Sequence, residues 1–302
     1  TVLHTALKVF KAECKEEILP DGMHFELSPM YHKLIFEGVI RVAVALKDRG
    51  LDDHEVDGYL QPMLDAAWSL EEGLDRIPLF NDAGNNVAKS LQALVSACKR
   101  HFDITPEYKS RFVDSGIYIF KQNDWKLIVD AGQPGPAYIP GHAHCDAMSF
   151  ELFKAGKPVI VNCGTYAYQC KERSFFRSTA AHNTVMVNDM EQSQCWGAFR
   201  MAKRSKVNVV SVSENSIVIE LIDQCGQAVK RTIQLEKTMK VTDESSGNKL
   251  TAFVHLIREI NMTFEGDAKT TGQQYAPEYG ELVSLEAVKY EGNGKISVEI
   301  CI

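Results

Sequence analysis

In the first third of the chain, apolar residues recur at the spacing of three to four positions that is typical of amphipathic helices. This spacing predicts four helices, over residues 1–19, 29–46, 52–70 and 87–101. Ser28-Pro29 gives the second helix a defined start, because serine caps helices and proline fits their first turn. No strand pattern interrupts these helices.

Beyond residue 116 the period changes to that of β-strands. Short apolar or alternating runs follow one another at 117–120, 125–129, 148–153, 158–162, 183–188, 206–212, 217–222, 228–235 and 251–258. Strands without intervening helices favour an antiparallel architecture. We therefore expect an α+β protein with a helical domain over residues 1–105 and a two-sheet antiparallel β-sandwich over residues 106–302.

Polar and ionisable residues gather between the predicted strands from Gly141 to Val187. In an extended segment, residues separated by one position point to opposite faces. His142 is therefore expected to face a cleft, and His144 a buried site. His144, Asn162 and His182 are candidate ligands for a metal such as zinc, although an asparagine oxygen is a weaker ligand than a carboxylate. Taken singly, each histidine fits an ordinary core or surface role equally well.

Three motifs lie in this region, GHAHCD from Gly141, VIVNCGTY from Val159 and RSTAAHNTV from Arg177. They show a resemblance to the C-terminal half of the heparinase II/III-like polysaccharide lyases. A second block agrees with it, DGMHFELSPMYH from Asp21 followed by IPLFND from Ile77. The resemblance implies that the predicted helices are the C-terminal part of an α/α toroid. It also implies a structural zinc ion that braces the sandwich, and no organic cofactor.

The family resemblance implies β-elimination on a uronic acid within an anionic polysaccharide. Such an enzyme must neutralise the carboxylate, remove the proton beside it and protonate the leaving glycosidic oxygen. Tyr31 and His142 match the catalytic positions. Tyr31 falls in the first turn of a predicted helix, where the helix dipole stabilises negative charge by roughly 0.3–1 kcal/mol and would help a phenolate to form. An ordinary packing role for Tyr31 is the alternative.

Five further residues are expected to line the substrate site, namely His32, Glu26, Asn81, Arg173 and Arg177. The two arginines could clamp a carboxylate or sulfate through two parallel hydrogen bonds. Surface salt bridges for the arginines, and a turn-forming role for Asn81, are the alternatives.

Two departures from the family pattern affect these expectations. Asn162 stands where the family usually has aspartate, which would weaken zinc binding, pass the ligand role to another residue such as Asp146, or leave the site without a metal. The family also carries an Asn-His pair upstream of the tyrosine helix, where it neutralises the substrate carboxylate. No such pair precedes Tyr31, so the chain is expected to begin after it.

Composition limits the partners and leaves the compartment open. The 302 residues carry a net charge of −7, which argues against a general nucleic-acid binder but allows a locally basic cleft for an anionic glycan. Eight scattered cysteines without a CxxC pair fit reduced thiols and a cytoplasmic protein. The family resemblance instead implies the periplasm or cell envelope. No apolar run reaches the length of a membrane span. The sequence leaves the oligomeric state undecided, and a homodimer is one possibility.

Three functions are weighed from these observations. The leading hypothesis is a lyase acting on a uronate-containing glycan, with heparan sulfate, alginate, chondroitin, hyaluronan and bacterial exopolysaccharides as candidate substrates. The second is a catalytically incomplete glycan-binding relative associated with surface-polysaccharide metabolism. The third is a metal-dependent hydrolase that uses His144 and His182.

Overall fold

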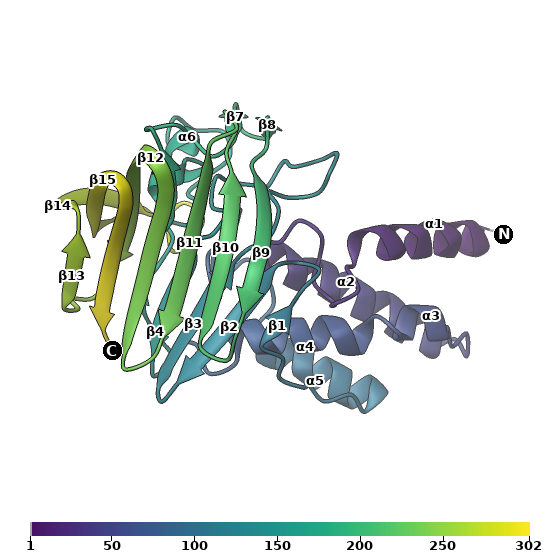
Figure 1. Ribbon diagram of the computed structural model, residues 1–302. Coiled ribbons are helices and arrows are strands. Elements are labelled where there is room, and N and C mark those ends of the chain that lie inside the picture. Colours follow the sequence, from purple (N-terminus) through teal and green to yellow (C-terminus); the bar gives the residue numbers. More distant parts are fainter. Residues whose placement is uncertain (1) are drawn as a thin grey trace.

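Five helices lie at one end of a large curled sheet in the computed structural model, which describes residues 2–302 (Figure 1). The helices are α1 (Val2–Glu17), α2 (Pro29–Lys47), α3 (His54–Asp57), α4 (Leu60–Glu71) and α5 (Leu91–Phe102). The α+β class is confirmed, whereas the toroid implied by the resemblance stays a prediction. No helix within residues 2–302 is both long and apolar enough to cross a membrane.

The start of α2 is confirmed at the residues that the sequence singles out. The Ser28 hydroxyl accepts a hydrogen bond from the backbone N–H of Tyr31 at 3.2 Å, and Pro29 occupies the first turn. The helix predicted over 52–70 is instead two helices, α3 and α4, separated at Gly58 and Tyr59. Helix α5 begins only after Ser90, whose hydroxyl caps it. The helices pack their apolar faces around α2, which fixes the position of Tyr31 in the fold.

Thirteen strands form one antiparallel sheet, and β7 and β8 form a separate hairpin. The strands are β1 (Arg111–Phe112), β2 (Ile117–Gln122), β3 (Trp125–Asp130), β4 (Phe150–Lys154), β5 (Lys157–Ile160), β6 (Val185–Val187), β7 (Gln194–Trp196), β8 (Arg200–Ala202), β9 (Lys206–Val212), β10 (Ser216–Ile222), β11 (Ala228–Leu235), β12 (Thr238–Leu256), β13 (Met262–Glu265), β14 (Asp267–Tyr275) and β15 (Val283–Cys301). A short helix α6 (Arg173–Phe176) and the 3₁₀ turn η1 (Thr179–Ala181) lie between β5 and β6.

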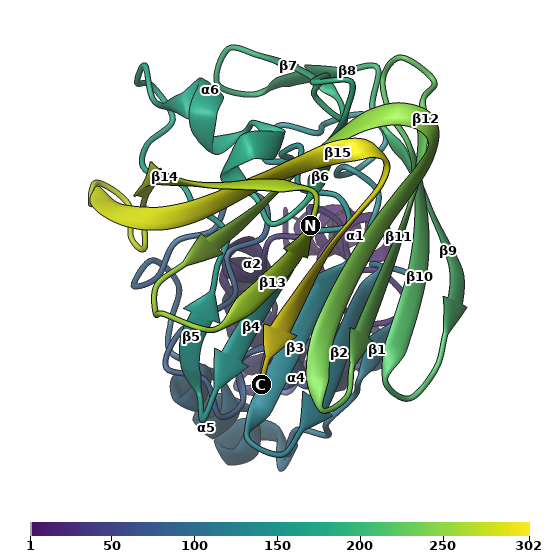
Figure 2. The same ribbon diagram turned by 60° about the vertical axis from the view of Figure 1, so that its left-hand side comes forward.

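The two layers expected of a sandwich are joined into one continuous, curled sheet (Figure 2). Strands β12 and β15 each have 19 residues and pair with one another over most of their length. A strand of that length extends over roughly 60 Å, so it bends and takes part in both layers. The pairing register shifts between Glu244 and Lys249, and β12 contacts β11 before the shift and β5 and β6 after it. The apolar core lies between the facing layers.

A buried ion pair attaches the irregular segments to this sheet. Arg231 on β11 binds both carboxylate oxygens of Asp243 on β12, at 2.7 and 2.8 Å, and neither side chain is exposed. The same guanidinium donates to the backbone carbonyls of Met148 and Asn183, at 2.9 and 2.8 Å. These two bonds hold the loops that precede β4 and β6 against the sheet.

Glu151 on β4 joins two further loops from inside the protein. Its Oε1 atom accepts hydrogen bonds from the backbone N–H groups of Leu79, at 3.1 Å, and Asn162, at 2.8 Å. Burial raises the pKa of Glu151 to about 7, against the opposing charge of Arg76. The folded state therefore binds the proton of this carboxyl group more tightly than the unfolded chain does.

This raised pKa makes stability depend on pH in a defined direction. The contribution of Glu151 is complete below the ordinary carboxyl pKa of 4.5 and is lost as the pH rises through about 7. Glu151→Gln keeps an oxygen for both N–H groups and has no charge to bury. We expect the melting temperature of Glu151→Gln minus that of wild type to be larger at about pH 8 than at about pH 5. The exposed Glu214→Gln serves as control, and an equal difference at both pH values would contradict the assignment.

Candidate active site

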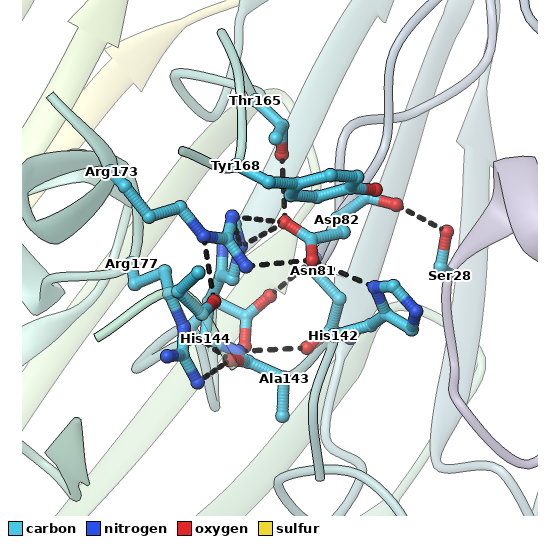
Figure 3. A network of polar contacts seen from close by, with 12 residues as sticks. Ser28, Asn81, Asp82, His142, Ala143, His144, Thr165, Tyr168, Arg173 and Arg177 are labelled. Atoms are coloured by element: carbon cyan, nitrogen blue, oxygen red, sulfur yellow. Dashed lines mark hydrogen bonds and ion pairs between the residues drawn. The ribbon is translucent and has the colours of Figure 1, made fainter. Parts of the chain in front are cut away.

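The carboxylate of Asp82 is the centre of a buried polar network (Figure 3). It accepts hydrogen bonds from His142 Nδ1 at 2.9 Å, His144 Nε2 at 2.8 Å and Thr165 Oγ1 at 3.2 Å. Arg173 binds both oxygens, with Nη2 at 2.7 Å from Oδ2 and Nη1 against Oδ1. Burial by itself would raise the pKa of Asp82, but His144, His142 and Arg173 outweigh it and hold this pKa well below its usual range.

Asn81 supports this carboxylate from the preceding position, in the left-handed conformation that asparagine tolerates (φ 55°). Its backbone N–H donates to Asp146 Oδ2 at 2.7 Å, and its side-chain oxygen accepts from the backbone N–H of His144 at 3.2 Å. Its side-chain N–H donates to the carbonyl of Leu27. The polar groups of Asn81 thus join three loops, and its contact with substrate stays a prediction.

His142 and His144 lie in a loop of turns, so the alternation of a strand does not apply to them. Both imidazoles reach the same carboxylate, rather than opposite faces. They differ in burial: the His142 side chain is 22% exposed and that of His144 is fully enclosed. Because an ionised carboxylate only accepts, His142 donates through Nδ1 and presents Nε2 to the open side, 3.9 Å from Glu26 Oε1.

Tyr31 and His142 stand side by side at the open edge of the network, with ring centroids 4.1 Å apart. The Tyr31 hydroxyl lies 2.6 Å from that of Tyr168, whose ring is covered by the Arg173 guanidinium at 5.1 Å. Burial raises the pKa of Tyr31, and the hydrogen bond from Tyr168 only partly opposes this. The ionisation expected from the helix terminus is therefore not favoured overall. Tyr168 was missed because it lies in a loop without periodicity.

Three side chains behind the Asp82 network could hold a metal ion, since ligand atoms of His144, Asp146 and His182 lie within 4.8 Å of one another. Asp82 accepts the N–H of His144 Nε2, and the Ser178 carbonyl, at 2.8 Å, accepts that of His182 Nδ1. The remaining ring nitrogens, His144 Nδ1 and His182 Nε2, then face each other with their lone pairs at a distance of 3.2 Å. A divalent cation would relieve this opposition, so the donor set fits a zinc-type site.

Burial keeps both of these imidazoles neutral, as metal ligation requires. It lowers the pKa of His144 to about 4 and that of His182 well below the usual value. Asn162 is engaged elsewhere: its side-chain oxygen accepts from the Asn183 N–H at 3.0 Å and its amide nitrogen donates to Ser149 at 3.3 Å. The geometry therefore gives the oxygen ligand to Asp146 in place of Asn162.

The polar groups of three more residues expected to contact substrate are used inside the protein. His32 is fully buried, accepts from the His24 N–H at 3.2 Å and donates to the Met63 carbonyl at 2.9 Å. Arg173, besides binding Asp82, donates to the Ala198 carbonyl.

Arg177 is the third of these residues and is also buried. It donates to the carbonyls of Ala143, Gly197 and Arg200. Both arginines thus hold the β7–β8 hairpin against the site, and their contact with a substrate stays a prediction. Glu26 Oε1 lies 3.9 Å from His142 Nε2, and its contact with substrate stays a prediction.

Heparinases are among the solved structures that share this fold. The chain superimposes on a heparinase III gene product with a TM-score of 0.82 at 17% identity, over 98% of this chain and 55% of the other. It superimposes on a heparan sulfate lyase from Pedobacter heparinus with a TM-score of 0.77 at 18% identity, over 97% and 55%. At these identities the likeness shows the fold alone.

Sequence comparisons reach the same group of proteins. The chain is 24% identical to heparin-sulfate lyases from Pedobacter heparinus, over 61% of this chain and 32% of that protein, and from Bacteroides stercoris, over 70% and 35%. It thus spans about a third of the length of these relatives. The model of the heparinase II/III N-terminus matches residues 2–110, and that of the heparinase II/III-like C-terminal domain matches residues 104–292. Because these matches span most of its length, the chain belongs to the heparinase II/III-like family.

Proposed function

We propose that this chain carries catalytic residues of a polysaccharide lyase that cleaves a uronate-containing anionic glycan by β-elimination. The observation that carries the proposal is the pairing of Tyr31 with His142 at the open edge of the Asp82 network. A phenol and an imidazole are both proton-transfer groups, and elimination needs such groups but no redox cofactor. The curated relatives are heparin-sulfate lyases, so heparan-type glycans are the first substrates to test.

The proposed roles follow from the hydrogen bonds of each side chain. Asp82 holds the Nδ1 proton of His142, so the Nε2 atom is directed away from the network. In its imidazolium form His142 donates its Nε2–H to the substrate carboxylate and neutralises it as the adjacent carbon loses its proton. Tyr31, beside this imidazole, removes that proton as a phenolate and returns it to the leaving glycosidic oxygen.

A metal ion would have a structural role in this proposal. His144, Asp146 and His182 would hold it, and it would supply positive charge that orders the segments on which these ligands lie. Asp82 connects the candidate metal ligands to the proposed catalytic pair, because its two oxygens accept hydrogen bonds from His144 and His142 respectively. A metal-dependent hydrolase fits less well, because His144 and His182 are enclosed whereas catalytic zinc needs an open position.

A catalytically incomplete glycan-binding relative is the second candidate, and one observation favours it. Arg173 and Arg177 are both committed to protein acceptors, so neither guanidinium is available to a substrate carboxylate. Among these candidate residues, this leaves the partly exposed His142 to meet a substrate carboxylate at the open edge, beside a Tyr31 whose pKa is raised.

The first test removes the Tyr31 hydroxyl. We expect Tyr31→Phe to lower the ultraviolet signal of unsaturated uronyl ends by roughly 10²–10⁴-fold, as for loss of a general acid–base group, at unchanged melting temperature. The natural full-length protein is assayed on a panel of acidic polysaccharides that includes heparan sulfate. Tyr59→Phe, which alters a phenol in the helical core, is the matched control. Retained turnover in Tyr31→Phe would contradict the role of Tyr31, and glycan binding without turnover in wild type would support the binding relative.

The second test concerns the metal. Zinc at about a hundred times its dissociation constant should stabilise the folded protein by about 2.7 kcal/mol, which raises the melting temperature by several degrees. His182→Ala should abolish this rise, because it removes one of the facing lone pairs. The exposed His54→Ala should retain it. A rise that survives His182→Ala would place the metal elsewhere.

A further inference from the structure

The loop between β14 and β15 reaches the candidate active site from the far end of the sequence. Two backbone hydrogen bonds fix it to the loops that form the site. Gly280 N–H donates to the Tyr166 carbonyl at 2.8 Å, and Asn85 N–H donates to the Pro277 carbonyl at 3.0 Å. A segment held on both sides in this way can place a side chain with little freedom.

The side chain placed there is Tyr279. Its hydroxyl forms a hydrogen bond with that of Tyr168, and the two rings meet edge to face with centroids 5.4 Å apart. Tyr168 in turn lies 2.6 Å from the Tyr31 hydroxyl, so three phenols form one hydrogen-bonded chain. Gly84 makes room for it, because a Cβ atom at this position would lie 2.8 Å from the Tyr279 ring.

The direction of donation along this chain decides which phenol can carry charge. Each hydroxyl has a single proton to donate. If Tyr279 donates to Tyr168, the Tyr168 proton is free to point at Tyr31, whose oxygen becomes the accepting end. A phenolate at that end gains a donor in a partly buried place, where charge-assisted hydrogen bonds are strongest.

We propose that Tyr279 is a positioning residue for the elimination, which orients the Tyr168 hydroxyl toward Tyr31 and makes Tyr31 the phenol that ionises. The inference rests on the role of Tyr31 in the proposed function. It names a contribution from a loop that lies more than two hundred residues after Tyr31 in the sequence.

The charges around the chain make Tyr168 the phenol that ionises least readily. Burial raises the pKa of all three phenols, but hydrogen bonding within the chain lowers the pKa of the two end phenols, Tyr31 and Tyr279, and raises that of Tyr168. Asp82 opposes ionisation of each phenol, and Glu26 opposes that of Tyr31. The Arg173 guanidinium over Tyr168 and the His142 ring beside Tyr31 complete the surroundings.

The test measures the ionisation of Tyr31 directly. Ultraviolet pH titration of the natural full-length protein, minus that of its Tyr31→Phe counterpart, isolates the Tyr31 phenolate. We expect Tyr279→Phe to raise the apparent pKa of Tyr31 by about one pH unit, which is tenfold less phenolate at a given pH. Tyr275→Phe is the matched control, because that buried hydroxyl has no hydrogen-bond partner among residues 2–302. Equal titrations of Tyr279→Phe and Tyr275→Phe would overturn the proposal.

A second variant and a kinetic readout separate this proposal from the function on which it rests. Gly84→Ala keeps the Tyr279 hydroxyl but displaces its ring, so it should shift the Tyr31 titration in the same direction. On heparan sulfate, the acid limb of the kcat/KM profile should move with the titration while KM stays unchanged. A shifted titration in a protein without turnover would support the phenol chain and refute the lyase. Turnover together with an unshifted Tyr31 titration and an unshifted acid limb of kcat/KM in both variants would support the lyase and refute the phenol chain.

Discussion

The buried charge of Asp82 is the constraint on which the rest of the site depends. A carboxylate without exposure is tolerated only where donors surround it, and here two imidazoles, a guanidinium and a hydroxyl do so. Because its two oxygens serve different histidines, one side chain sets the orientation of both the open imidazole, His142, and the enclosed one, His144. The proposed reaction chemistry and the proposed metal ligation are therefore joined at one residue.

The sheet serves this network by holding loops that have little regular structure of their own. The bidentate pair of Arg231 with Asp243 attaches the backbone at Met148 and Asn183, and Glu151 attaches Leu79 and Asn162. Each is a buried polar group whose hydrogen bonds are made with backbone atoms of the loops, so the loops share the rigidity of the strands.

The sequence could predict the elements whose signals are local. The capped start of α2 follows from Ser28 and Pro29, and most strands up to β11 follow from their alternation. Strands β13 to β15 were not predicted, although Ile296, Val298 and Ile300 alternate in β15. The site was harder, because residue types show what a side chain can bind but not what it meets. Arg173 and Arg177 have the chemistry of substrate clamps, yet Asp82 and backbone carbonyls occupy them. Tyr279 is brought in by tertiary structure alone.

The account is tested most directly by the protonation of the two imidazoles around Asp82. A long-range nitrogen–proton NMR correlation spectrum of the histidine rings distinguishes the two tautomers. The account predicts a proton on Nδ1 of His142 and on Nε2 of His144, each bonded to Asp82, and the loss of both signatures in Asp82→Asn. Unprotonated Nδ1 in His142, or histidine signals that do not change in Asp82→Asn, would contradict the claim that this carboxylate organises the site.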